Sequence, residues 1–257
     1  MRKVSFYSYK GGVGRSLSLV NVAHVMAQRQ AKKVGLLDLD IDAAGLCHIL
    51  DVNPNSDFDL LSLLQPGNRK TVDLGRYVQE VRTIGSAKSK VMLIPTISDS
   101  KLMRTFEWDK NVEKFLGEEV IPEFGKLYEL DYLLIDGRTG LSKFSGFAIK
   151  QADLVVLMCK LDRQNQFGIS RMAKILTEAG KKYLTVVSGC PKTGKAAKRI
   201  AEFRKMIKAD IDCVLPYVPD LYFDEFVISK EMPKSKLAKE YVQLVSKIEE
   251  RLNADGI

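Results

Sequence analysis

Seven residues near the N-terminus bring together three glycines, two cations and a hydroxyl. They read Lys10-Gly11-Gly12-Val13-Gly14-Arg15-Ser16 and follow directly on an apolar run, residues 4–9. Because glycine has no β-carbon, the backbone N–H groups of such a loop can turn inward around phosphate oxygens. Residues 17–30 continue as an apolar helix, whose N-terminus would add about half a positive charge. Strand, glycine loop and helix together predict a phosphate-binding site; the alternative is a glycine turn without a ligand.

Aspartates follow two other apolar runs, at positions where parallel strands would end. The first segment reads Asp38-Leu39-Asp40, and the second begins at Asp136. In a doubly wound sheet these carboxylates should lie beside the glycine loop. Aspartate suits magnesium, a hard cation that prefers oxygen ligands, and Ser16 offers the same ion a hydroxyl. We therefore expect a magnesium site from Ser16, Asp40 and Asp136; the alternative for the first segment is an aspartate-rich turn with capping duties only.

The glycine loop departs from the common phosphate-loop pattern, G-x-x-x-x-G-K-[ST]. Tyr9 stands in place of its first glycine and Arg15 in place of its lysine. It resembles instead the deviant loop K-G-G-x-G-K-[ST] of the MinD and ParA ATPases. That resemblance implies that Lys10 is the signature lysine, which reaches across an ATP-sandwiched dimer to the partner's phosphates. It also implies nucleotide contacts from Lys10, Gly11, Gly12, Val13, Gly14, Arg15, Ser16 and Leu17.

Arg15 is a departure from the family loop as well. Arginine keeps the positive charge of lysine, but its planar fork is longer and differently shaped. We expect nucleotide binding to survive this exchange better than turnover does. Catalysis is assigned to Lys10, Arg15 and Asp40.

The two aspartate segments extend the resemblance. The segment with Asp40 is similar to the family's first switch, in which this residue would orient or activate the attacking water. The second switch is usually D-x-P-x-G, and here it reads Asp136-Gly137-Arg138-Thr139-Gly140. Arg138 thus replaces a proline. The sequence leaves open whether this arginine contacts a phosphate, a partner protein or an acidic residue in a salt bridge.

Adenine is favoured over guanine as the base. The segment Cys159-Lys160-Leu161-Asp162 matches the last three positions of the N/T-K-x-D guanine element, but it follows a strand too early. The loop in the corresponding place, residues 188–192, contains no aspartate. In the family, adenine is framed by that loop and by a segment after the last strand, which implies Pro216 and Tyr217 here. An ordinary turn is the alternative for either residue.

Positioning these residues requires strands and helices that alternate along the chain. The alternation predicts right-handed crossovers, and hence an α/β fold with a doubly wound, mostly parallel seven-stranded sheet and helices on both faces. Short apolar runs predict strands at residues 4–9, 34–39, 91–94, 132–135, 154–158, 184–187 and 213–215. Apolar spacings of three and four predict helices at residues 16–30, 111–127, 168–179, 196–208 and 234–252. Residues 50–90 receive no role.

Length and composition are those of one folded domain. We expect residues 1–257 to form a single P-loop ATPase domain, with 46% apolar and 28% charged residues. The four cysteines form no C-x-x-C pair, so neither a zinc site nor a redox motif is suggested. We see no signal peptide and no membrane span, and we expect a cytoplasmic protein.

Surface charge suggests where a partner would bind. Seven cations and one acid occupy residues 192–208, and the net charge of the chain is +8. Non-specific DNA binding through Lys192, Lys195, Lys198 and Arg199 is one interpretation, and a solvated helix face is the other. The apolar stripe of residues 234–252 has a mixed polar face, which favours core packing over membrane binding.

Taken together, these patterns predict a slow, magnesium-dependent ATPase. It would act as an ATP-dependent homodimerisation switch in partition or positioning of DNA, such as chromosome partitioning, or of a protein complex. Its protein partner is not identified by the sequence. The alternative is an ATP-gated binding or regulatory module in which Arg15 abolishes turnover.

Overall fold

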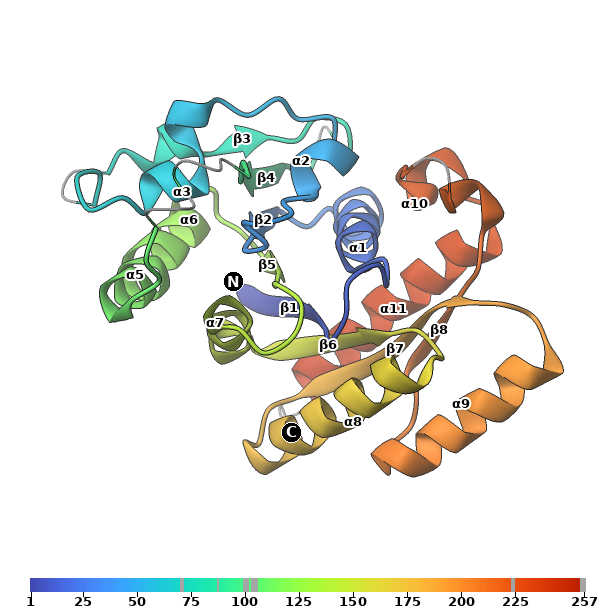
Figure 1. Ribbon diagram of the computed structural model, residues 1–257. Coiled ribbons are helices and arrows are strands. Elements are labelled where there is room, and N and C mark those ends of the chain that lie inside the picture. Colours follow the sequence, from blue (N-terminus) through green and yellow to red (C-terminus); the bar gives the residue numbers. More distant parts are fainter. Residues whose placement is uncertain (70–71, 87, 99–101, 103–105, 223–224, 255–257) are drawn as a thin grey trace.

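The computed structural model describes residues 1–69, 72–86, 88–98, 102, 106–222 and 225–254. Within these residues an eight-stranded sheet has the order β3-β4-β2-β5-β1-β6-β7-β8 (Figure 1). Neighbouring strands are parallel, except for the antiparallel pair β3 and β4. The strands are β1 (Arg2–Ser8), β2 (Val34–Asp38), β3 (Gln79–Glu80), β4 (Val91–Ile94), β5 (Tyr132–Asp136), β6 (Leu154–Cys159), β7 (Tyr183–Cys190) and β8 (Cys213–Pro216).

The predicted mostly parallel sheet is confirmed, but the predicted strand number was wrong. All seven expected strands are present, and the structure adds β3 at the edge. Two residues are too few to show an apolar alternation, so β3 left no signal in the sequence. Strand β7 runs to Cys190 rather than residue 187, through an irregular register between Val187 and Cys190.

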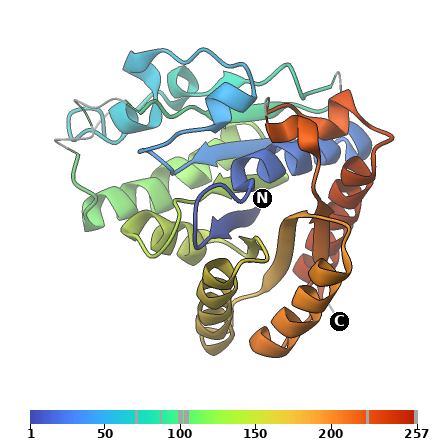
Figure 2. The same ribbon diagram turned by 45° about the vertical axis from the view of Figure 1, so that its right-hand side comes forward.

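Helices cover both faces of the sheet, as predicted for a doubly wound fold. Helices α1 and α11 pack together on one face, while α8 and α9 lie on the other (Figures 1 and 2). Within β1, Phe6 packs into the first of these cores and Tyr7 into the second. The helices are α1 (Arg15–Gln30), α2 (Leu46–Ile49), α3 (Leu60–Leu63), α5 (Lys110–Lys114), α6 (Ile121–Leu127), α7 (Lys143–Gln151), α8 (Arg163–Glu178), α9 (Gly194–Ile207), α10 (Ile228–Glu231) and α11 (Lys236–Asn253).

Two predicted helices differ in detail. The helix expected at residues 111–127 is divided into α5, a π-helical segment (Phe115–Val120) and α6. The wide π turn precedes Pro122, which has no N–H to donate to an α-helical hydrogen bond. Helix α8 begins at Arg163, five residues before the predicted start at 168. Asp162 caps it by accepting the backbone N–H groups of Gln164 and Asn165 at 3.1 and 3.0 Å.

Helix α7 was not predicted, although its start is well defined. Ser142 and Ser145 form a capping box, in which each side chain bonds the backbone of the other. Phe144, Phe147 and Ala148 then occupy the three- and four-residue spacings of a buried face. The nine-residue helix is shorter than α1, α8, α9 and α11, and its apolar pattern spans only two turns.

Candidate functional site

The glycine loop connects β1 to α1 at the centre of the sheet. Gly12 and Gly14 have φ angles of 69° and 74°, in the left-handed region that suits glycine. An ideal β-carbon at Gly11, Gly12 or Gly14 would meet no protein atom within 4 Å. The loop therefore borders open space at the N-terminus of α1, in a pocket of about 290 Å³ that Ser16 and Asp40 also line. We call it the phosphate pocket, after the ligand predicted from the sequence. A helix N-terminus with free N–H groups at such a pocket is suited to an anion.

Arg15, the first residue of α1, is buried beneath this pocket. Its Nε donates to Asp136 Oδ1, its Nη2 to Asp40 Oδ2 at 2.8 Å, and its Nη1 to Ser8 Oγ at 3.4 Å. Burial lowers the pKa of Arg15, but the carboxylates of Asp136 and Asp40 outweigh burial and raise this pKa above its ordinary value. The arginine is therefore a permanent cation between the two predicted catalytic and metal-binding carboxylates.

Asp38 and Asp40 have different surroundings. Asp38 is fully buried, and its carboxylate accepts the backbone N–H groups of Asp40, Gly45 and Leu46 at 3.0, 3.1 and 3.2 Å. Burial, and then the neighbouring Asp136, raise the pKa of Asp38. Asp40 lines the phosphate pocket, whereas Asp38 folds the loop that follows β2. Only Asp40 of the pair is placed to meet a ligand.

Asp136 ends β5 directly beside Asp38 in the parallel register of β2 and β5. It is completely buried, and its Oδ2 has no hydrogen-bond partner among the residues that the structure describes. A buried carboxylate oxygen without a partner normally has a role, because leaving it unsatisfied costs free energy. This hard oxygen, with the Ser16 hydroxyl in the adjoining pocket, fits a magnesium ion.

Arg138 joins the two switch segments. It forms an ion pair with Asp42, and both side chains are about one third exposed, at 37% and 36%. Of the three contacts left open for this arginine by the sequence, the structure contains the salt bridge. The link ties the loop after β5 to the loop after β2.

Lys10 lies apart from the other loop residues. It is exposed, does not line the phosphate pocket, and donates from Nζ to Gln164 Oε1 at the start of α8. Gly168 allows α8 to approach the loop, because a β-carbon there would collide with the ring of Tyr9. Lys10 is thus held at the surface rather than over the phosphate pocket of its own chain.

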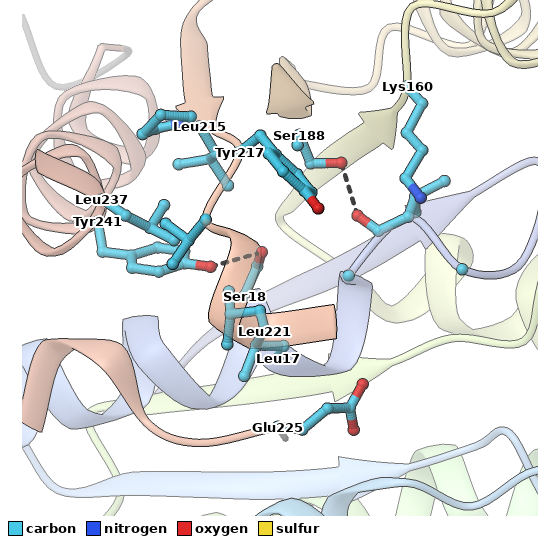
Figure 3. A pocket seen from close by; sticks show the side chains of 16 residues that line it. Leu17, Ser18, Lys160, Ser188, Leu215, Tyr217, Leu221, Glu225, Leu237 and Tyr241 are labelled. Atoms are coloured by element: carbon cyan, nitrogen blue, oxygen red, sulfur yellow. Dashed lines mark hydrogen bonds between the residues drawn. The ribbon is translucent and has the colours of Figure 1, made fainter. Parts of the chain in front are cut away.

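A second pocket, of about 400 Å³, adjoins the loop on the side of β7 and β8. Gly12, Gly14, Ser188, Pro216 and Tyr217 line it, and Figure 3 shows how these segments converge. The Ser188 hydroxyl donates to the carbonyl of the loop residue Val13 at 2.6 Å, which fixes the β7 end against the loop. The pocket lies where the sequence predicted the adenine, with both Pro216 and Tyr217 in its wall.

Several residues of this pocket were not predicted, among them Tyr241, Lys160 and Glu225. Tyr241 of α11 is buried, and its hydroxyl lies 3.2 Å from Ser18 Oγ, so the C-terminal helix contributes to the pocket as well as to the core. Lys160 follows β6, and Glu225 borders both pockets (Figure 3). For Tyr241 the available signal was a tyrosine within an otherwise aliphatic stripe. Lys160 belonged to the segment that was compared with the guanine element, and Glu225 had no signal.

The loop, the strand-end aspartates and the sheet order define a P-loop nucleotide-binding protein. Residues 1–187 match the model of the AAA domain family AAA_31. The flagellum site-determining protein YlxH of Helicobacter pylori is 28% identical over 159 residues, which are 62% of this chain and 48% of that protein. The match thus spans about half the length of this curated relative.

Solved structures share the fold. The cell division ATPase MinD of Pyrococcus furiosus has a TM-score of 0.76 and 21% identity, covering 97% of this chain and 98% of that one. The septum site-determining protein MinD of Pyrococcus horikoshii, complexed with Mg-ADP, has a TM-score of 0.75 and 20% identity, covering 96% and 95%. The chain belongs to the AAA_31 family and has the fold of the MinD/ParA P-loop ATPases, which confirms the resemblance drawn from the sequence.

No helix among the described residues is long and apolar enough to cross a membrane. The apolar stripe of α11, which includes Leu244, Val245 and Ile248, is buried in the core that α1 shares. This packing agrees with the interpretation favoured from the sequence, and it leaves little of the stripe to meet a lipid surface.

Proposed function

We propose that this protein binds ATP across the two adjoining pockets and hydrolyses it slowly. The observation that carries the proposal is that Gly12, Val13, Gly14 and Leu17 line both pockets, of about 290 and 400 Å³. The smaller pocket, at the N-terminus of α1, suits the phosphates, and the larger one suits the nucleoside. One continuous sheet under both pockets supports a single P-loop domain for residues 1–257.

Ser16 and Asp136, with Asp40 nearby, would hold magnesium, which would supply positive charge to offset the terminal phosphates when bound. The chain's own residues supply the remaining chemistry. Asp40 lines the phosphate pocket and can accept a proton from, or orient, a water beside the terminal phosphate. Arg15 holds Asp40 in place at 2.8 Å and brings a positive charge to the developing charge of the transition state.

We infer that ATP also drives dimerisation, with Lys10 as the residue that crosses between protomers. Its exposure, and its distance from the phosphate pocket of its own chain, support a role toward a second copy. Two-fold symmetry would make the contact reciprocal. Gln164 holds the lysine in the single chain, so dimerisation would exchange a hydrogen bond to a neutral amide for one to a negatively charged phosphate.

The test combines two measurements on the same samples: steady-state ATP hydrolysis with magnesium, and the mass of the particle with and without ATP. Lys10→Ala should lose both turnover and the ATP-dependent dimer, whereas Asp40→Ala should lose turnover and keep the dimer. Lys143→Ala is a matched control, because this lysine bonds the Trp108 carbonyl outside both pockets. Dimers of the native chain without turnover, with turnover restored by Arg15→Lys, would favour the non-hydrolysing binding module instead.

A second candidate function is DNA binding by α9 and the residues before it. Lys192, Lys195 and Lys198 are exposed, and Lys195, Lys198 and Arg199 border a hollow between α8 and α9 together with Arg163. Such a cluster can neutralise successive phosphates and release counterions. Together with ATP-dependent dimerisation, it would fit partition or positioning of DNA or of a protein complex bound to it.

The DNA candidate predicts a salt-dependent affinity for duplex DNA that a double variant, Lys195→Ala with Lys198→Ala, weakens at every sequence tested. The matched control is Lys110→Ala with Lys114→Ala, which removes two exposed lysines from α5. Equal losses of DNA affinity in both double variants would mean that only net charge matters. Unchanged DNA affinity in the Lys195→Ala, Lys198→Ala variant would exclude α9 as the binding surface.

A further inference from the structure

Arg15 lines the phosphate pocket, and its guanidinium bonds both strand-end carboxylates. Arg15 is 7% exposed, and the side chains of its two acidic partners, Asp40 and Asp136, are 12% and 0% exposed. Ion pairs sheltered to this degree are screened much less by salt than those at a surface. The chain therefore carries its own fixed cation at the carboxylates where a P-loop protein usually has a metal ion close by.

The shape of the guanidinium allows a further contact. It has five N–H groups in a planar fork, whereas a lysine ammonium has three at one point. Asp136, Asp40 and Ser8 accept three of the five, and the other two N–H groups have no acceptor within the described part of the chain. Arg15 also lines the phosphate pocket with the glycines of the loop. A terminal phosphate there can accept the remaining N–H groups while Arg15 stays on the two carboxylates.

The charge at this place explains why such a bridge matters. Asp40, Asp136 and the terminal phosphates are all negative, and in P-loop proteins the metal ion offsets their repulsion. Here Arg15 already offsets part of it, through two charge-assisted hydrogen bonds. A lysine in the same position would bring the same charge without a fork that spans both carboxylates and the phosphate.

We propose that Arg15 bridges the terminal phosphate of ATP to Asp40 and Asp136, so that the chain captures ATP without magnesium. This inference rests on the proposed ATP binding at the glycine loop. Ser16 and Asp136 Oδ2, which has no hydrogen-bond partner among the described residues, would then hold magnesium for turnover rather than for capture. Arg15, the departure from the family's loop, would thus let ATP bind first and leave magnesium necessary only for turnover.

The test is an equilibrium titration of the native chain with ATP, once with magnesium and once with excess EDTA. The affinities should agree within about threefold, less than the tenfold that about 1.4 kcal/mol produces. Arg15→Lys should lose at least about tenfold when magnesium is removed, the loss expected for a charge-assisted hydrogen bond. Arg29→Lys, an exposed arginine at the other end of α1, should behave like the native chain.

The outcomes separate this inference from the proposed function. ATP binding by the native chain only when magnesium is present would overturn the inference and leave nucleotide binding intact. If the native chain bound no ATP in either condition, both the proposed nucleotide binding and this inference would be overturned. The native titrations decide the matter even where Arg15→Lys does not fold, which circular dichroism of that variant would reveal.

Discussion

Replacing Arg15 by methionine should destabilise the folded chain strongly. The substitution keeps most of the side-chain volume but leaves Asp136, which is 0% exposed, without its cation. Removing one partner of a buried pair typically costs about 3–5 kcal/mol, because the other charge stays buried and unpaired. Asp40 is slightly exposed and should add less. We therefore expect a loss of about 3 kcal/mol or more in the free energy of unfolding at neutral pH.

The measurement is urea denaturation of the native chain, Arg15→Met, Asp136→Asn and the double variant. The double variant should recover a good part of the loss, because a neutral amide no longer needs the cation. Burial raises the pKa of Asp136, and removing Arg15 takes away the charge that opposes this shift. The cost of Arg15→Met should therefore shrink as the pH falls and Asp136 takes up a proton. A loss below about 1 kcal/mol at neutral pH, the range of an exposed pair, would refute the buried cluster.

Three further predictions concern single side chains. Asp40→Asn should lower ATP turnover by about 10²-fold or more while ATP affinity changes little, and equal losses in both would assign Asp40 to binding instead. Tyr217→Ala should weaken ATP binding by at least about fivefold in calorimetry if the exposed ring stacks on the base, and unchanged affinity would exclude stacking. Burial, then Lys230 and Arg29, lower the pKa of His24 to about 4. Since an unfolded histidine titrates near 6.5, the native chain should keep full stability above that pH and lose up to about 3 kcal/mol as the pH falls to about 4. His24→Asn should lack this slope in denaturant titrations, and an unchanged slope would contradict the assignment.

The parts of the fold that sequence could predict are those with local signals. Buried parallel strands are continuous apolar runs, so β2, β4 and β5 were recognised within a residue of their ends. The strand β3 consists of two residues that pair with β4, and only the finished sheet defines it. The sequence around Asp162 fits two different roles. It was compared with a base-recognition element, whereas in the structure Asp162 caps α8.

In the candidate site, too, only the features with a local sequence signal could be predicted. The loop and the positions of Asp40 and Asp136 follow from strand ends that share one edge of the sheet, and the structure brings them together around one pocket. Strand ends predicted that Asp40 and Asp136 lie near the loop, but not that the Arg15 side chain bonds both, because side-chain direction depends on packing. Tyr241 enters the larger pocket, which we propose for the nucleoside, only because α11 packs on α1. Contacts between distant segments depend on packing, which no local pattern records.

The central claim, that ATP binds at the glycine loop, is tested most directly by calorimetric titration of the native chain, Gly12→Ala and Gly67→Ala with magnesium and ATP. A β-carbon at either glycine meets no protein atom within 4 Å, but Gly12 borders both pockets and Gly67 neither. Gly12 also has a φ of 69°, so its substitution disturbs the loop as well as the space above it. We predict ATP binding in the native chain and in Gly67→Ala, weakened at least about tenfold in Gly12→Ala. Equal binding by all three proteins, or by none, would contradict the account.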